Sequence, residues 1–198
     1  MLKIGITGGI GSGKSVVSKI FETLCIPVFD ADSAAKKAMN ENEAVKKSLQ
    51  EQFGPDIYTN GILNRKYLAN IVFNNKGQLE KLNTIVHPAA IEMGLQWAAK
   101  QTAPYLIKEA ALLFEAGSAL NLDYVIGIAA PQHLRIQRAM QRDDISREEV
   151  LARMDKQIDE NIKMRLCDFI IVNDEQQLVI PQVLSLHEQF IHEAKSRS

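Results

Sequence analysis

A chain of 198 residues, 46% of them hydrophobic, can bury a substantial core and suits one compact domain with an insertion or two. Its 23 basic residues nearly balance its 24 acidic ones, so it lacks the basic field that would attract nucleic acid or an anionic membrane. Neither an export signal nor an apolar run approaching the roughly 20 residues needed to span a bilayer is visible, so we expect a cytoplasmic protein.

The N-terminal segment predicts a strand, a glycine-rich loop and a helix in direct succession. Apolar residues alternate from Leu2 to Ile6, glycines follow, and apolar residues then recur at helical spacing over residues 17–24. A second strand is expected at residues 27–29, directly before the acidic pair Asp30 and Asp32. Both carboxylates would then lie at the carboxyl end of a strand.

Residues 33–99 form a long, polar, helix-forming stretch without an obvious central strand. Turn signals interrupt it at residues 54–56 and 59–61. Because a strand-to-strand crossover needs far fewer residues, we interpret this stretch as a helical insertion beside the sheet, where it would bind substrate.

Three further strand patterns follow, at residues 105–107, 124–129 and 169–172. Five strands alternating with helices predict a parallel sheet covered on both faces. The segment 131–165 is dense in arginine and acidic residues and predicts a solvent-exposed helical pair. From residue 178 onward an apolar stripe predicts a last helix that packs on the sheet.

The two cysteines, Cys25 and Cys167, lie far apart without a CxxC motif or a neighbouring histidine. We expect reduced, buried thiols that serve packing, rather than a disulfide or a zinc site.

The glycine-rich loop carries a phosphate-binding pattern. Gly8, Gly13, Lys14 and Ser15 match GxxxxGK[ST], after a predicted strand and at the start of a predicted helix. Glycines leave backbone N–H groups free to converge on phosphate oxygens, and the helix N-terminus adds a favourable dipole. Lys14 would reach the β and γ phosphates of ATP, and the Ser15 hydroxyl would ligate Mg²⁺. A glycine-rich turn without a ligand is the disfavoured alternative, and the loop alone does not separate kinases from GTPases or motors.

The rest of the chain favours a small-molecule kinase. The DxxG and NKxD elements of a regulatory GTPase are missing from the sequence. Asp32 is the better candidate for the general base. The alternative makes Asp30 or Asp32 only a turn former or a cap for a helix beginning near residue 33, and for Asp30 the two interpretations have equal weight. Arg138 and Arg142 are four residues apart and would share a helical face that could close over the triphosphate, with a solvated charged face as the alternative.

Six segments together resemble the dephospho-CoA kinase family: TGGIGSGKS (7–15), DAD (30–32), ILNRKYL (62–68), IVHP (85–88), ALLFE (111–115) and QRAMQRD (137–143). The resemblance covers nearly the whole chain. It implies that the ribose 3′-hydroxyl of dephospho-CoA is phosphorylated with MgATP, the final step of coenzyme A synthesis.

The patterns and the resemblance together predict an α/β, P-loop NTPase-type three-layer fold with a five-stranded parallel sheet flanked by helices. The expected nucleotide-binding core comprises residues 1–32, 100–130 and 166–198. Residues 33–99 would form the helical acceptor domain for CoA, and residues 131–165 the helical lid.

The resemblance also implies roles for particular residues. Catalysis is assigned to Asp32, Lys14, Arg138 and Arg142. ATP binding is assigned to Gly9, Gly11, Ser12, Gly13, Lys14, Ser15, Val16, Arg142 and Asn173, and Mg²⁺ binding to Ser15. Acceptor binding is assigned to Thr7, Asp32, Arg65, His87, Leu112 and Leu113. Without the resemblance, His87 would be a structural histidine before a helix that starts at Pro88, and both leucines would be core residues.

Three positions depart from the family pattern: Val16 follows the loop serine where threonine is common, Ala111 replaces a common proline, and Glu109 replaces a frequent aspartate. None of the three removes a required functional group. The Glu109 side chain is one methylene longer than that of aspartate, beside the expected magnesium.

Two other functions stay open at the level of sequence: another small-molecule P-loop kinase, acting on a nucleoside or nucleotide, and a non-catalytic ATP-binding regulatory protein. We expect small-molecule partners, ATP and dephospho-CoA, no nucleic acid or membrane partner, and a monomer or weak oligomer.

Overall fold

The computed structural model describes residues 1–72 and 75–197, which fall into two compact units. The first unit combines Met1–Asp30 with Gln101–Ser198, and the second is Ala31–Lys100. The roles expected for the segments, namely core, acceptor domain and lid, stay predictions.

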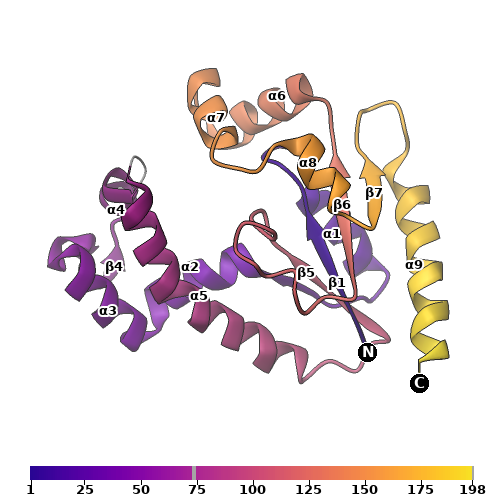
Figure 1. The fold of residues 1–198 in the computed structure, drawn as a ribbon, viewed down its shortest axis with the longest axis horizontal. Helices are drawn as coiled ribbons and strands as arrows, with labels where there is room; N and C mark the ends of the chain where they lie inside the picture. Colours follow the sequence, from indigo (N-terminus) through magenta and orange to yellow (C-terminus); the bar gives the residue numbers. More distant parts are fainter. Residues whose placement is uncertain (73–74, 198) are drawn as a thin grey trace. The chain divides into compact units, whose positions relative to one another are not determined.

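The first unit is built on five parallel strands (Figure 1). They are β1 (Leu2–Thr7), β2 (Val28–Asp30), β5 (Tyr105–Glu109), β6 (Tyr124–Ala129) and β7 (Phe169–Val172), in the spatial order β2-β5-β1-β6-β7. The predicted five-stranded parallel sheet is confirmed. Because β1 is hydrogen-bonded on both sides, to β5 and to β6, its end is held at the middle of the sheet.

Helices cover both faces of this sheet. On one face, Ile4, Ile6 and Ile126 belong to the main core together with residues of α1 (Lys14–Thr23) and α9 (Val179–Ser196). The other face carries glycines because the chain approaches it closely: a Cβ on Gly5 would lie 2.7 Å from Leu122 Cδ1. A Cβ on Gly127 would lie 2.8 Å from the sulfur atoms of Met164, in α8 (Glu160–Arg165), and Cys167. The sheet is therefore the middle layer of three.

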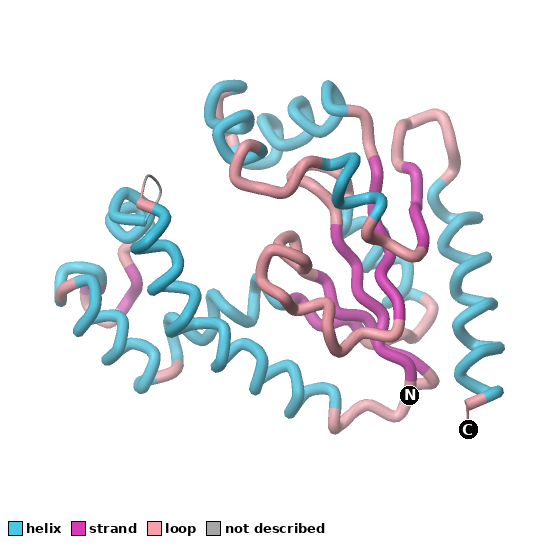
Figure 2. Tube along the Cα trace, viewed as in Figure 1, coloured by secondary structure: helices cyan, strands magenta, loops and turns pink. Residues whose placement is uncertain are grey.

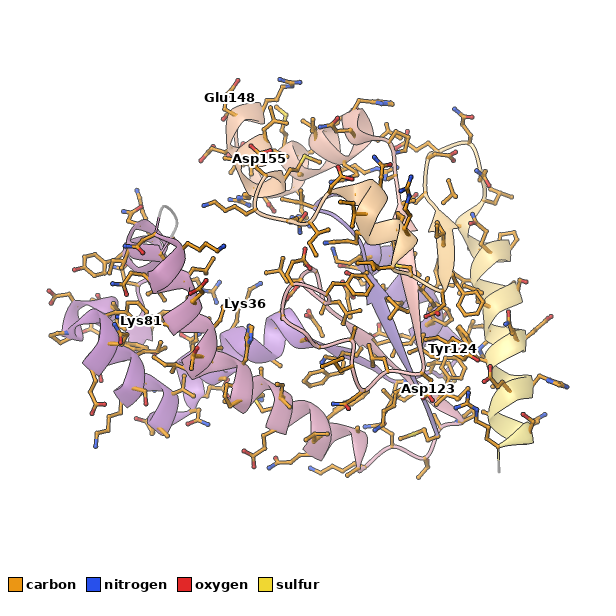
Figure 3. The ribbon with its side chains drawn as sticks, viewed as in Figure 1. Lys36, Lys81, Asp123, Tyr124, Glu148 and Asp155 are labelled. Carbon is orange, nitrogen blue, oxygen red and sulfur yellow. The ribbon has the colours of Figure 1, made fainter. Side chains whose placement is uncertain are left out.

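The last helix, α9, is fastened to the sheet by polar contacts as well as by its apolar stripe. Figure 3 shows Asp123 and Tyr124 beside it. Tyr124 donates a hydrogen bond to Glu193 at 2.8 Å, and Arg197, directly after α9, donates to Asp123 at 2.7 Å. The predicted packing of this helix on the sheet is confirmed.

The segment between β6 and β7 differs from its prediction as an exposed helical pair. It forms three helices, α6 (Gln132–Asp143), α7 (Arg147–Met154) and α8. Ile136, Ala139 and Val150 form a small buried cluster there. The charged segment has a core because its few apolar residues converge between α6 and α7.

The second unit is mainly helical (Figure 2). Its elements are α2 (Ala31–Glu41), α3 (Glu43–Phe53), a 3-10 turn (Pro55–Ile57), β3 (Tyr58–Thr59), β4 (Ile62–Leu63), α4 (Arg65–Val72) and α5 (Lys76–Ala98). The two short strands form a hairpin whose turn residues, Asn60 and Gly61, have φ values of 52° and 78°, as a tight hairpin turn requires. A separate apolar cluster that includes Leu49, Ile57 and Val86 gives this unit its own core.

Three local expectations were wrong. Pro88 lies inside α5 and does not start a helix. The helix after β2 begins at Ala31, so Asp32 lies in its first turn instead of before it. Cys25 is exposed, whereas Cys167 is half-buried and burial raises the pKa of its thiol to about 12.

No helix in residues 1–72 or 75–197 is long and apolar enough to cross a membrane.

Candidate active site

The phosphate loop joins the central strand β1 to α1. Gly13 precedes the helix with a φ of 97°, a left-handed conformation that glycine adopts without steric cost. Within the described residues, the backbone N–H groups of Gly11, Gly13 and Ser15 have no hydrogen-bond partner. Unsatisfied N–H groups at a helix N-terminus form a binding site for an anion.

Two carbonyls of the loop accept hydrogen bonds from side chains elsewhere in the unit. The carbonyl of Ile10 accepts a hydrogen bond from Arg135 Nε at 3.2 Å, and that of Ser12 accepts one from Asn173 Nδ2 at 2.8 Å. Because these two carbonyls accept from side chains outside the loop, they do not pair with the loop's own amides, which can then donate to phosphates.

Lys14 lies over the loop that it follows in sequence. Its Nζ donates a hydrogen bond to the carbonyl of Gly8 at 3.0 Å. The lysine ammonium is therefore held at the loop before any phosphate arrives. Thr7, directly before the loop, is fully buried, and its hydroxyl has no hydrogen-bond partner among the described residues.

A carboxylate lies beside the Ser15 hydroxyl. Ser15 Oγ donates a hydrogen bond to Glu109 Oε1 at 3.2 Å, and Glu109 is only 9% exposed. A hydroxyl and a carboxylate are the hard oxygen donors that Mg²⁺ prefers, so these residues fit the expected ion. The described residues contain no cluster of three His, Cys, Asp or Glu that could hold a metal unaided.

The acidic pair and the residues expected to bind the acceptor are divided between the two units. Asp30 ends β2 and pairs in register with Glu109, at the carboxyl edge of the sheet in the first unit. Asp32, in the first turn of α2, and Arg65, the first residue of α4, are exposed in the second unit. His87 is half-buried within α5, also in the second unit.

The two arginines expected in the lid have different surroundings. Arg138 donates to the carbonyl of Asn173 at 3.1 Å and to Glu175 at 2.9 Å, so it joins α6 to the loop after β7. Arg142 has a 62% exposed side chain and forms a two-point hydrogen bond with Asp143, at 2.7 and 3.0 Å. That bond, opposed by partial burial, lowers the pKa of the Asp143 carboxyl.

The apolar candidates also differ in exposure. Leu113 is fully buried, whereas Leu112 is 42% exposed. Val16, after the loop serine, is 56% exposed. Leu112 and Val16 therefore present apolar surface, whereas Leu113 packs in the interior.

Sequence reasoning missed two residues that contact the loop. Arg135 is 6% exposed and bonds the carbonyl of Ile10, and Gln157 accepts a hydrogen bond from the Ile10 N–H at 3.0 Å. For Arg135 a signal existed, because it lies three and seven residues before the two predicted arginines and thus on their helical face. Nothing in the sequence marked Gln157.

A parallel sheet whose central strand leads through a glycine-rich loop into a helix defines a P-loop nucleotide-binding protein. The sequence model of the family described as "Dephospho-CoA kinase" matches residues 2–178. The chain therefore belongs to the dephospho-CoA kinase family.

Individual relatives agree with this assignment. The dephospho-CoA kinase of Porphyromonas gingivalis is 40% identical over 189 residues, which are 95% of this chain and 94% of that protein. A crystal structure from Thermus thermophilus has a TM-score of 0.85 at 33% identity and covers 97% of each chain. The dephospho-CoA kinase structure from Campylobacter jejuni has a TM-score of 0.67 at 32% identity, over 99% of this chain and 98% of that one.

Proposed function

We propose that this protein transfers the γ-phosphoryl group of ATP to the ribose 3′-hydroxyl of dephospho-CoA, giving CoA and ADP, the final step of coenzyme A biosynthesis. Family membership supports the acceptor. The observation that carries the phosphoryl-transfer chemistry is the loop itself, with its unsatisfied amides next to Lys14 and the Ser15–Glu109 pair.

The loop and Lys14 bind the triphosphate. The amides of Gly11, Gly13 and Ser15 donate to phosphate oxygens, and Lys14 exchanges its bond to the Gly8 carbonyl for the β and γ phosphates. Ser15 and Glu109 would hold Mg²⁺, which when bound shields phosphate charge. The remaining ATP contacts are assigned to Gly9, Ser12, Val16, Arg142 and Asn173.

Asp32 serves as the general base. It accepts the proton of the 3′-hydroxyl as that oxygen forms a bond to the γ-phosphorus, and the bond from phosphorus to the departing ADP oxygen breaks. Arg138 and Arg142 stabilise the charge that spreads over the transferring group. The acceptor is held by Thr7, Arg65, His87, Leu112 and Leu113.

Positioning supplies most of the rate in such a transfer, because the protein forms no covalent bond to the phosphoryl group. We also propose that the enzyme works in the cytoplasm as a monomer or weak oligomer.

A comparison of acceptors tests the proposal. Purified protein with MgATP is assayed for ADP release with dephospho-CoA, adenosine or AMP. Turnover with dephospho-CoA at least about 100-fold above the others, in kcat/KM, is expected, because binding energy from the remote part of the acceptor is used in the transition state. Preferential phosphorylation of adenosine or AMP would identify a nucleoside or nucleotide kinase. ATP binding without turnover of any acceptor would support the regulatory alternative.

A further inference from the structure

Ile10, at the tip of the phosphate loop, is held in three ways by the helices that follow β6. Its N–H donates to Gln157 Oε1 at 3.0 Å, and its carbonyl accepts from Arg135 Nε at 3.2 Å. Its side chain packs against the small core of α6 and α7, which comprises Ile136, Ala139 and Val150. The N–H and the carbonyl of Ile10 are thus hydrogen-bonded by the segment between α7 and α8 and by α6, and its side chain packs on α6 and α7.

The glycines around Ile10 permit this contact. A Cβ on Gly9 would lie 2.7 Å from both Arg135 Cζ and Glu160 Oε2, and a Cβ on Gly11 would overlap the carbonyl oxygen of Arg135. Contacts this short do not occur between real atoms, so a larger residue at Gly9 would displace the Arg135 and Glu160 side chains, and one at Gly11 would push the backbone of α6 away from the loop. Glycine at these two positions therefore serves the approach of α6 as well as the approach of a phosphate.

Arg135 is buried between the phosphate loop and α8 and bonds to both. Its side chain is 8% exposed and pairs with Glu160 of α8 at 3.0 Å, while its Nε bonds the loop carbonyl. A buried guanidinium that loses a partner is costly, because its charge is left without compensation in a poorly solvated place. Arg135 therefore resists separation of α6 and α8 from the loop.

We propose that Ile10, Arg135 and Gln157 form a latch that joins the phosphate loop to α6–α8, so that triphosphate binding and the packing of these helices are one coupled equilibrium. A lid that swings independently of the loop would not place a loop side chain in its own core. Coupling is reciprocal: a ligand that fixes the loop stabilises α6–α8, and loosening α6–α8 weakens the ligand. The proposal rests on binding of a nucleoside triphosphate by the loop, and not on the identity of the acceptor.

The test measures ligand affinity and helix protection without any acceptor. Binding of the non-hydrolysable analogue AMP-PNP with Mg²⁺ is followed by calorimetry, and protection of the amides of residues 132–165 by hydrogen exchange. In the unmodified protein the ligand is expected to slow exchange in α6–α8.

Two variants separate the contacts of the latch. Gln157→Leu removes the acceptor of the Ile10 N–H and is expected to weaken AMP-PNP binding by about 3- to 10-fold, the equivalent of one net hydrogen bond. Gln141→Leu is the matched control, since Gln141 is exposed in α6 and its amide has no bond among the described residues; its affinity should be unchanged. Ile10→Ala should weaken binding by at least about 10-fold and reduce the ligand-induced protection, whereas Ile10→Val should restore most of both.

A merely structural role predicts another result. If Ile10→Ala and Gln157→Leu lower the melting temperature but bind AMP-PNP with normal affinity and show full ligand-induced protection, loop and helices are independent and the proposal is wrong. Loss of affinity without loss of ligand-induced protection would overturn it as well. Because no acceptor is present, failure to phosphorylate dephospho-CoA would contradict the proposed function and leave this test unaffected. If Ile10→Ala does not fold, Gln157→Leu and its control decide the question alone.

Discussion

The hydroxyl of Ser15 lies 3.2 Å from a carboxylate oxygen of Glu109, where the first turn of α1 meets the carboxyl end of β5. Strand pairing fixes this geometry, because Glu109 is in register with Ile6 of the strand that leads into the loop. The carboxylate of Glu109, although one methylene farther from the backbone than that of an aspartate, therefore lies beside the serine that is expected to hold magnesium.

Glu109→Gln keeps the shape of the side chain and removes its charge. We expect the Mg²⁺ concentration for half-maximal turnover to rise by about 10- to 100-fold, the usual effect of a lost group beside a metal site. Glu109→Asp keeps the charge and should stay near the original value. A Mg²⁺ titration at fixed ATP measures the midpoint of both variants. An unchanged midpoint in Glu109→Gln would show that Glu109 does not help to bind the ion.

Asp32→Asn should lower kcat by about 10²- to 10⁴-fold and leave ATP affinity nearly unchanged, because a positioned base contributes to the chemical step and not to nucleotide binding. Asp30→Asn is the matched control two residues earlier, and we expect less than a 10-fold loss. Single-turnover kinetics with dephospho-CoA distinguish the two. Equal losses in both variants would contradict the assignment of Asp32 as the base.

Arg142→Ala should slow phosphoryl transfer by about 10²-fold or more while changing the KM for dephospho-CoA much less, since charge on the transferring group is greatest in the transition state. Arg153→Ala is a suitable control because Arg153 also pairs with Asp143, at 2.9 Å, but has no proposed phosphate contact. Equal rates of phosphoryl transfer in the two variants would show that Arg142 is a surface arginine without a role in the transfer.

A buried ion pair outside the phosphate site predicts a dependence of stability on pH. Lys163 is fully buried, and its Nζ contacts Glu115 Oε1 at 2.9 Å and the carbonyl of Ala111 at 3.1 Å. Although partial burial raises the pKa of Glu115, the bonds from Lys163 and from backbone amides outweigh it and lower that pKa from its ordinary value of 4.5. A carboxyl with a lowered folded pKa stabilises the protein above its unfolded pKa. This stability is lost as the pH falls from about 4.5 through the lowered value.

Glu115→Gln should therefore destabilise the fold by about 2 kcal/mol at neutral pH, less than for a fully buried pair because Glu115 keeps 17% of its side chain exposed. It should also flatten the acid limb of the stability curve. Glu41→Gln, which breaks the exposed pair with Lys37, should cost no more than about 0.5 kcal/mol. Denaturant unfolding between pH 3 and 7 measures both variants, and a Glu115→Gln curve parallel to the original would contradict the account.

The strands of the main sheet were predictable because each is a short apolar run bounded by polar or turn residues. The run at residues 124–129 was located to the residue. The hairpin of β3 and β4 was predicted only as a turn, because each strand has two residues and no room for an alternating pattern. Pro88 was misassigned because proline usually marks a helix start, and here tertiary packing keeps it within a long helix.

The position of the loop at residues 8–15, between a strand and a helix, was predictable because it depends on neighbours in sequence, whereas contacts that depend on packing were not. Arg135 shares a helical face with the two predicted arginines, but its burial comes from the convergence of α6, α8 and the loop, which the sequence does not show. Lys163 was likewise unremarkable in sequence, since its partner Glu115 lies 48 positions earlier on a different segment.

Identification of the product tests the central claim most directly. The protein is incubated with MgATP and dephospho-CoA, and the product is analysed by mass spectrometry and phosphorus NMR. We predict CoA carrying its new phosphate on the ribose 3′-oxygen, formed in a one-to-one ratio with ADP and formed about 10²- to 10⁴-fold more slowly by Asp32→Asn. ATP hydrolysis without CoA, or a phosphate on another hydroxyl, would contradict the account.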